Sequence, residues 1–168
     1  LISRLGNGTD KIDVAPATER GIVVSNVPDF CTDEMADYVM AMVLYFSREI
    51  SRMARHMRAG AFGRARAESL ALRRLSSRTL GLIGWGASAM AVTRRALPFG
   101  MKVIATRRDL GKPSPEAEKL GVEIVGLDEL LERADFVSLH LPLTDQSRGL
   151  LSSDRLGRMK RGAYLINA

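Results

Sequence analysis

The segment Thr79–Arg108 reads TLGLIGWGASAMAVTRRALPFGMKVIATRR, and the prediction of the fold rests on it. Its first apolar run, Leu80–Ile83, has the length of a buried parallel strand. Good helix formers with apolar residues at helical spacing cover Ala87–Leu97, and a second apolar run covers Met101–Ala105. A strand, a glycine turn, a helix and a second strand within ~30 residues predict a βαβ unit.

The turn of this unit carries a Gly-x-Gly-x-x-Ala pattern. Gly84 lets the strand turn sharply, because it lacks the Cβ that makes a positive φ costly. Gly86 lets a pyrophosphate approach the first N–H groups of the helix, where the helix dipole favours an anion, and the small Ala89 allows close packing. In this context the pattern predicts a dinucleotide-binding loop. The alternative is a structural glycine turn that binds no ligand.

An arginine follows the second strand of the unit. An acidic residue often stands ~20 residues after the first glycine, where it binds the ribose 2′-hydroxyl of NAD. This chain has Arg107 there, with Arg108 beside it and Lys112 close behind. A guanidinium suits the 2′-phosphate of NADP, so we expect NADP to be favoured over NAD. The alternative is that both arginines are ordinary surface charges.

Composition limits the classes of protein that fit. The length of 168 residues suits one domain or one and a half small ones, and 46% apolar with 26% charged residues is typical of a soluble globular protein. No apolar run reaches ~18 residues and no secretory signal is visible, so we expect a cytoplasmic protein without a membrane partner. The single cysteine, Cys31, agrees with a reducing compartment. The net charge of +6 is dispersed and lacks interleaved aromatic residues, so we expect no nucleic-acid partner.

The chain before the glycine turn divides into three parts. Residues 1–31 are βαβ-like, with strands at Leu1–Arg4 and Ile22–Ser25 and a helix at Asp10–Arg20. We expect one long helix over Thr32–Arg58, which is apolar all round at its centre and therefore buried on several sides. The arginine-rich segment Gly60–Arg78 shows no clear period and is expected to be a linker or an arm before the glycine turn, most simply a solvated loop.

After Arg108 helices and strands alternate, which predicts a parallel sheet with ligands bound beyond the carboxyl ends of its strands. We expect helices at 113–120, 127–133 (capped by Asp128) and 152–159, and strands at 122–125, 135–139 and 163–167. His140 is interpreted as a strand-end residue near a cofactor rather than a catalytic base. No metal-ligand cluster and no nucleophile–base pair is visible, so no metal site is expected.

Several motifs stand in a specific order along nearly the whole chain. They are GNGTDKID (6–13), RGIVVSNVP (20–28), TDEMADYVMAMVL (32–44), TLGLIGWGASA (79–89), FGMKVIATRR (99–108), ADFVSLHLPLTDQSRGLL (134–151) and MKRGAYLINA (159–168). The set resembles the D-isomer-specific 2-hydroxyacid dehydrogenases. That family includes phosphoglycerate dehydrogenases, glyoxylate/hydroxypyruvate reductases and the C-terminal-binding-protein corepressors.

The resemblance implies an α/β fold: an incomplete Rossmann-type doubly wound parallel sheet, preceded by the end of a flavodoxin-like substrate domain. Residues 1–31 would be the remnant of the substrate domain and residues 32–168 the NAD(P)-binding domain, with the active site in the cleft between them. Asn7 and Gly8 would hold the carboxylate of a small 2-oxo or 2-hydroxy acid. The cofactor-binding residues implied are Gly84, Trp85, Gly86, Ala87, Ser88, Arg107, Arg108, Leu141, Pro142, Thr144, Asn167 and Ala168. Family members commonly form homodimers through this domain, so a homodimer is expected.

The implied activity is hydride transfer between NAD(P) and a D-2-hydroxy acid. The family's catalytic arginine would fall a couple of positions beyond Ala168 and its glutamate and histidine further on. We therefore expect a fragment of a longer protein that contains no catalytic residue and is inactive alone. Two alternatives are a dinucleotide-binding module of the corepressor type and a truncated, non-functional product. The chain departs from the family at Trp85, which replaces a small apolar residue, and at Ala87 and Ser88, which replace an arginine and a branched apolar residue. Ser88 offers one hydrogen bond in place of the lost arginine contact.

Overall fold

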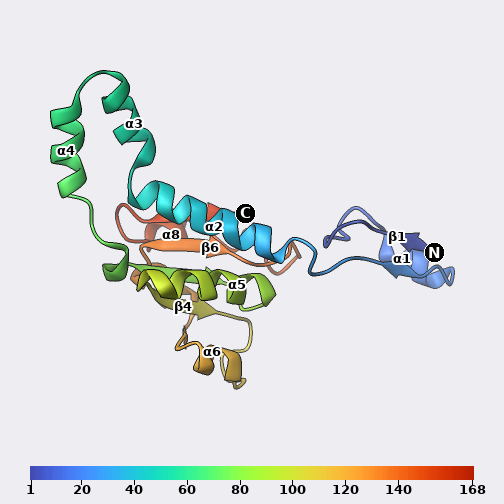
Figure 1. Ribbon diagram of the computed structural model, residues 1–168. Coiled ribbons are helices and arrows are strands. Elements are labelled where there is room, and N and C mark those ends of the chain that lie inside the picture. Colours follow the sequence, from blue (N-terminus) through green and yellow to red (C-terminus); the bar gives the residue numbers. More distant parts are fainter.

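A computed structural model describes residues 1–168, and a five-stranded parallel sheet forms its centre. The strands are β3 (Thr79–Ile83), β4 (Lys102–Thr106), β5 (Glu123–Ile124), β6 (Phe136–Leu139) and β7 (Tyr164–Asn167). Their order in the sheet is β5-β4-β3-β6-β7, with β3 in the middle, and Figure 1 labels β4 and β6. The order reverses between β3 and β6, as in a doubly wound fold. The predicted α/β class and the parallel sheet are confirmed.

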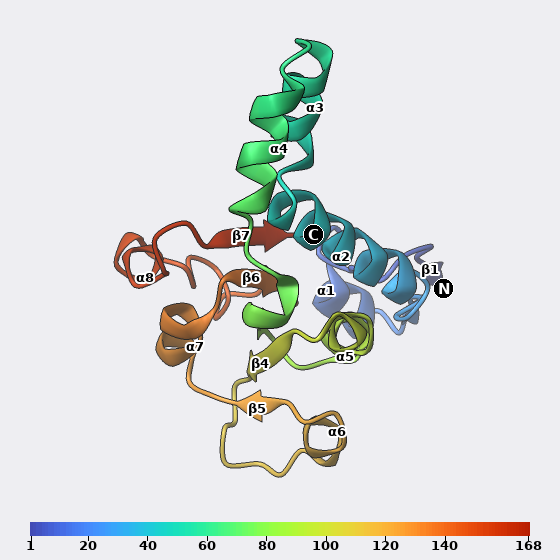
Figure 2. The same ribbon diagram turned by 60° about the vertical axis from the view of Figure 1, so that its left-hand side comes forward.

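Helices cover both faces of this sheet, and Figure 2 shows α2, α5 and α6 on one side with α7 and α8 on the other. Their bounds are α2 (Thr32–Ser47), α5 (Ala87–Ala96), α6 (Pro115–Lys119), α7 (Leu127–Arg133) and α8 (Ser153–Gly157). Side chains alternate along each strand, so Leu80 and Leu82 pack toward α2 and α5, whereas Ile83 packs toward α7. All three are buried, which places a separate apolar layer on each face.

The cap expected for the helix at 127–133 is wrong. The N-cap of α7 is Gly126, so the expected cap, Asp128, lies inside the first turn, where it pairs with Arg155 at 3.2 Å. An acidic side chain is favourable in a first turn because of the helix dipole. At α8 the N-cap is Ser152, which was expected inside the helix, and its side chain accepts a hydrogen bond from the backbone N–H of Arg155.

Residues 1–31 form a small separate unit. Strands β1 (Ile2–Ser3) and β2 (Val24–Ser25) pair in parallel, with α1 (Val14–Glu19) between them in the chain. Their two-stranded sheet shares no strand with the central sheet. Figure 1 shows this unit (dark blue) beside the main body, joined to α2 by a single segment of chain.

The expected long helix over Thr32–Arg58 is wrong, because the structure contains two helices there. The helix α2 ends at Ser47, and Glu49 takes a left-handed backbone conformation with φ 47° before α3 (Ile50–Arg58) begins. Glutamate rarely adopts a positive φ. The break was therefore not visible in the sequence, which has no glycine or proline at this point. The buried side of α2 packs on α5 and β7 of the same chain, and Tyr38 on its other side is 51% exposed.

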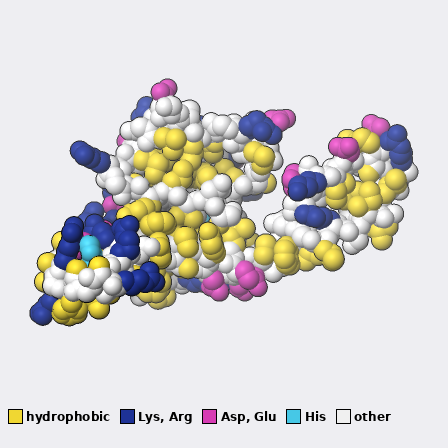
Figure 3. All heavy atoms as spheres, turned by 90° about the horizontal axis from the view of Figure 1, so that it is seen from above, with side chains coloured by type: hydrophobic (Ala, Val, Ile, Leu, Met, Phe, Trp, Pro, Cys, Tyr) yellow, Lys and Arg dark blue, Asp and Glu magenta, His cyan; other side chains and the backbone are white.

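The expectation of a solvated loop over Gly60–Arg78 is also wrong. This segment contains α4 (Phe62–Leu70) and the short helical turn η1 (Leu75–Ser77), and α4 folds back on α3 to form a helical hairpin. Figures 1 and 2 show this hairpin projecting from the body, and Figure 3 shows Lys and Arg side chains gathered at its end. In α3 and α4 together only Ala65 is buried. A helix without a buried face has no apolar period, which is why the pattern did not reveal it.

None of the helices combines the length and the apolar character needed to cross a membrane.

Candidate functional site

The turn after β3 is shaped by a close backbone approach. Gly84 has a φ of +105°, and a Cβ atom at this position would lie 2.4 Å from the carbonyl oxygen of His140. Only glycine fits there, since that oxygen belongs to the backbone after the neighbouring strand β6. The next residue, Trp85, is anchored by a hydrogen bond of 3.1 Å from its indole N–H to Ser114 Oγ. The turn therefore has a fixed shape at the point where the strand order reverses.

The first backbone N–H groups of α5, which directly follows this turn, have no hydrogen-bond partner within the helix. Gly86 is the N-cap, no side chain caps the helix, and the first N–H to bond within it is that of Met90, to Gly86 O at 3.0 Å. The N–H groups of residues 87–89 are thus left for an external acceptor. A Cβ at Gly86 would meet no atom within 4 Å, so the space beside the backbone is open. Free N–H groups, the helix dipole and open space suit an anion such as a phosphate.

A pocket of about 280 Å³ lies beside the turn. Its lining comes from the ends of β3 and β4, the start of α7 and the loop after β6: Ile83, Thr106, Arg107, Arg108, Leu127, Leu141, Pro142, Thr144, Gln146, Ser147 and Leu150. Five of these residues, Arg107, Arg108, Leu141, Pro142 and Thr144, are among the cofactor-binding residues that the family resemblance implies. The lining contains no acidic residue, and the buried Nε atom of Arg107 has no hydrogen-bond partner. The pocket thus offers apolar walls and two guanidinium groups.

A second hollow, of about 200 Å³, lies between the N-terminal unit and α5. It brings Asn7 together with Ala87 and Ser88, which are far apart in the sequence. The loop that carries Asn7 is held by a hydrogen bond of 2.8 Å from Asn26 Nδ2 to the carbonyl oxygen of Asn7. Gly8 follows in the same loop but does not line the hollow.

His140 makes two hydrogen bonds at the base of the site. Its Nδ1 lies 3.0 Å from Ser88 Oγ, and its Nε2 lies 3.0 Å from Ser138 Oγ. Burial lowers the pKa of His140 to about 4, so the ring is neutral at ordinary pH. Sequence reasoning placed His140 at a strand end but missed this bridge. The available signal was the serine at position 138, a polar residue in an otherwise apolar strand.

The remaining expected residues lie at the same edge of the sheet. Asn167 ends β7, where it pairs in register with Leu139, and Ala168 follows it. Both residues are exposed, and neither lines the pocket beside Arg107 or the second hollow. No group of three or more His, Cys, Asp or Glu side chains is arranged to hold a metal ion.

The strand order, the glycine turn, the free helix N-terminus and the adjoining pocket define a Rossmann-type dinucleotide-binding domain. Residues 40–168 match the NAD binding domain of the D-isomer specific 2-hydroxyacid dehydrogenases. The chain belongs to this family, so the resemblance stated from the motifs is confirmed.

Known relatives support this placement. The chain is 38% identical over 168 residues to D-3-phosphoglycerate dehydrogenase of Methanocaldococcus jannaschii, covering 99% of the chain and 31% of that protein. It is 38% identical over 167 residues to hydroxypyruvate reductase of Thermotoga maritima, covering 99% and 52%. It thus spans about half or less of the length of these relatives. A D-lactate dehydrogenase from Aquifex aeolicus, solved with NAD and lactic acid, superposes with a TM-score of 0.89 at 30% identity, covering 99% of this chain and 49% of that one.

Proposed function

We propose that this protein binds a nicotinamide dinucleotide and serves hydride transfer between that cofactor and a D-2-hydroxy or 2-oxo acid. The single observation that carries the proposal is the free N-terminus of α5 at the point where the strand order reverses. The family match to an NAD binding domain and the NAD complex of the Aquifex aeolicus relative support NAD(H) as the cofactor class. The reductases among the relatives support the substrate class.

Two parts of the cofactor, the diphosphate and the adenosine, have matching residues. The free N–H groups at the start of α5, with Ser88, suit the diphosphate, and the pocket beside Arg107 suits the adenosine. The nicotinamide supplies the hydride chemistry when it is bound. Asn7 and Gly8, in the loop on the other side of the second hollow, would hold the substrate carboxylate.

The test is a titration with NADH and NADPH, followed by fluorescence or calorimetry. Gly86→Val fills the open space beside the N-cap without a clash, so it should abolish binding, while the loss of a favourable N-cap residue should lower the stability of the apo protein by only about 1 kcal/mol. Gly126→Val is the matched control, because Gly126 is also an N-cap glycine with no atom near its Cβ position. No binding of either cofactor to the unmodified protein would overturn the proposal.

We extend the proposal to the choice of cofactor, NADP over NAD. The support is the pair Arg107 and Arg108 in a pocket without an acidic residue, and the unpaired Nε of Arg107. Hydrogen bonds to charged groups contribute ~1.5–3 kcal/mol each, so two partly exposed contacts favour NADP by roughly tenfold to a hundredfold. Arg107→Asp should move the preference towards NAD. The measurement is the dissociation constant of each cofactor at two salt concentrations, and equal constants for the unmodified protein would contradict the preference.

The chain of residues 1–168 is proposed to be inactive by itself. The arginine, glutamate and histidine implied by the family resemblance have no matching positions within it. General acid–base catalysis alone is typically worth 10²–10⁴-fold, so their absence should leave no measurable turnover. The assay is NADPH oxidation with glyoxylate or hydroxypyruvate. Turnover above a blank without the protein would show that other residues supply the chemistry.

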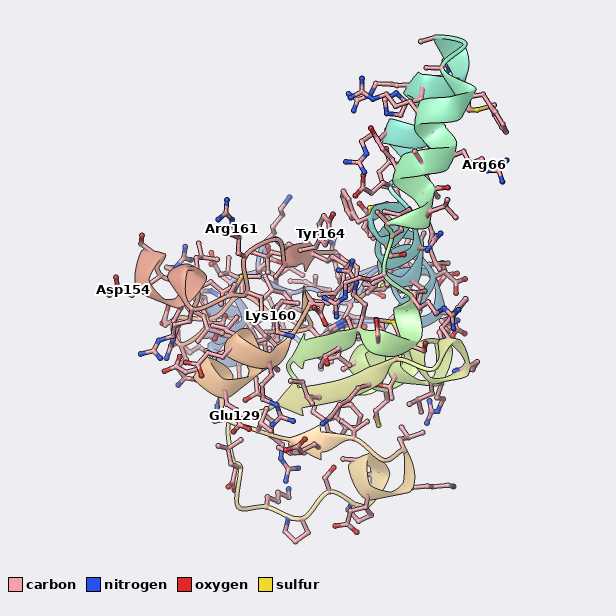
Figure 4. All side chains as sticks on the ribbon, turned by 90° about the vertical axis from the view of Figure 1, so that its left-hand side faces the viewer. Arg66, Glu129, Asp154, Lys160, Arg161 and Tyr164 are labelled. Atoms are coloured by element: carbon pink, nitrogen blue, oxygen red, sulfur yellow. The ribbon has the colours of Figure 1, made fainter.

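A homodimer is proposed through the projecting hairpin. Ile50, Met57 and Phe62 expose large apolar side chains on α3 and α4, with exposed fractions of 48%, 54% and 61%. Figure 4 shows Arg66 of α4 pointing away from the body, so the outer side of the hairpin is polar as well as apolar. Sedimentation should give a dimer for the unmodified protein and a monomer for Phe62→Glu. The control is Phe99→Glu, an exposed phenylalanine on the body. A monomer at every concentration of the unmodified protein would overturn the proposal.

A further inference from the structure

A histidine bridges two serines beneath the N-terminus of α5. His140 Nδ1 is within hydrogen-bond distance of Ser88 Oγ, and His140 Nε2 is within hydrogen-bond distance of Ser138 Oγ. A neutral imidazole has one N–H donor and one bare acceptor nitrogen. The two hydrogen bonds therefore run in one of two directions, and each direction gives Ser88 a different role.

The burial of Ser138 selects the direction. Ser138 is 0% exposed, and the hydrogen bond with His140 is the only one that its hydroxyl makes. Its neighbours across the sheet are Leu82 and Ile166, which offer no acceptor side chain. If Nε2 carried the imidazole proton, the hydroxyl proton of Ser138 would be buried without an acceptor. If Nε2 is bare, Ser138 donates to it and no buried proton is left unpaired.

The position of the imidazole proton also decides whether Ser88 can donate a hydrogen bond to a ligand. With the imidazole proton on Nδ1, Ser88 Oγ accepts from His140, and the hydroxyl proton of Ser88 stays free for an acceptor outside the chain. Ser88 lies in the first turn of α5, beside the free N–H groups, and lines the hollow next to that helix. We propose that His140 and Ser138 are positioning residues, which hold Ser88 as a hydrogen-bond donor to the diphosphate of the bound dinucleotide. This inference rests on the proposed function.

The direction of these two hydrogen bonds decides whether the Ser88 hydroxyl attracts or repels a phosphate. In the opposite direction the proton of Ser88 would point to His140, and only oxygen lone pairs would face the phosphate. In the direction selected by Ser138, Ser88 makes a charge-assisted hydrogen bond. That bond is worth about tenfold in affinity.

The first test measures the tautomer directly in the unmodified protein. Nitrogen-15 NMR distinguishes a protonated from a bare imidazole nitrogen, and the protein contains only two histidines. The variant His56→Gln removes the other histidine and so assigns the signals. We expect Nδ1 of His140 to be protonated and Nε2 to be bare at neutral pH. A protonated Nε2, or an equal mixture of the two forms, would overturn the inference.

The second test measures binding of ADP-ribose, which contains the diphosphate, and of adenosine 2′-phosphate, which does not. Ser88→Ala should weaken ADP-ribose about tenfold and leave adenosine 2′-phosphate unchanged. Ser138→Ala should weaken ADP-ribose by a smaller factor while it increases the Nε2-protonated form, and Ser138→Thr, which keeps the hydroxyl, should restore both. In the Ser88→Ala background, Ser138→Ala should have no further effect on affinity.

These outcomes separate the two proposals. If neither NADH nor NADPH binds the unmodified protein, the proposed function fails. If the cofactors bind but Ser88→Ala leaves the affinity for ADP-ribose unchanged, only the role of the Ser88–His140–Ser138 bridge fails. The same conclusion follows if Ser138→Ala lowers this affinity by the same factor with and without the Ser88 hydroxyl. Ser88 is partly exposed, so its variant tests the inference even where a substitution at Ser138 prevents folding.

Discussion

The sheet body and the α3–α4 hairpin are stabilised by different forces. In the body, side chains such as Leu82 and Phe136 are 0% exposed and lie within continuous apolar layers. In the hairpin, α3 has no buried residue, and Glu68 of α4 forms ion pairs with Arg52 and Arg64 and a hydrogen bond with His56, all at 2.9–3.0 Å. Burial of apolar surface contributes far more to stability than exposed ion pairs do. The body is therefore expected to unfold as one cooperative unit, with the hairpin depending on it or on a partner.

The largest difference in stability is expected between the alanine variants of two leucines, one in the body and one in the hairpin. Leu82→Ala removes a fully buried side chain from β3 and should lower the free energy of unfolding by about 2–5 kcal/mol. Leu70→Ala, at a position 79% exposed on α4, should stay within about 0.5 kcal/mol. Urea unfolding of both variants measures the difference. Comparable losses would mean that the hairpin belongs to the cooperative core.

Two glycines with positive φ give a second contrast. Gly84→Ala combines backbone strain with a Cβ placed 2.4 Å from the His140 carbonyl oxygen, and should cost about 3 kcal/mol. Gly60→Ala, in the turn between α3 and α4, carries only the strain, about 1–2 kcal/mol, because no atom lies within 4 Å. The comparison of the two melting temperatures isolates the cost of the close approach. A milder effect at Gly84 than at Gly60 would show that the turn after β3 can move.

The pH dependence of stability separates the two histidines. Burial lowers the pKa of His140 from 6.5 to about 4, so below pH 6.5 the unfolded state binds a proton that the folded state does not. The stability held above pH 6.5 should therefore fall as the pH drops towards 4, by about 2 kcal/mol between pH 8 and pH 5. His140→Gln should flatten this slope, whereas His56→Gln on the hairpin should keep it. Urea unfolding at several pH values provides the measurement, and an unchanged slope in His140→Gln would refute the assignment.

The smallest effect is expected at Glu68. Its pKa is lowered chiefly by hydrogen bonds from Arg64 and His56, so its pairing strengthens above the ordinary carboxyl pKa and is lost in acid. Glu68→Gln should increase amide hydrogen exchange in α3 and α4 without a measurable change in the global melting temperature. High salt should mimic the variant in the unmodified protein. Glu118→Gln, an exposed glutamate of α6, is the control; equal exchange in both variants would show that the ion pairs do not order the hairpin.

Local patterns predicted the body well. The glycine turn, the strands on either side of it and α5 follow from residues 79–106, because a buried strand and an amphipathic helix each leave a period in the sequence. The residues at the carboxyl ends of β3, β4 and β6 were expected together, and the structure brings Arg107, Leu141 and Thr144 into one pocket. The hairpin was missed for the opposite reason, since exposed helices need no apolar period and Glu49 breaks the helix without a glycine or proline.

The sequence by itself determined the alternation of strands and helices, the glycine turn and the family, because these depend on local composition and spacing. Only the tertiary structure decided which distant residues meet: Asn7 beside Ser88, and Ser88 joined through His140 to Ser138. These contacts depend on the order of strands in the sheet and on which face each side chain occupies. In the sequence, Ser138 is only a polar residue within an apolar strand. In the fold, its buried hydroxyl has no hydrogen-bond partner other than His140.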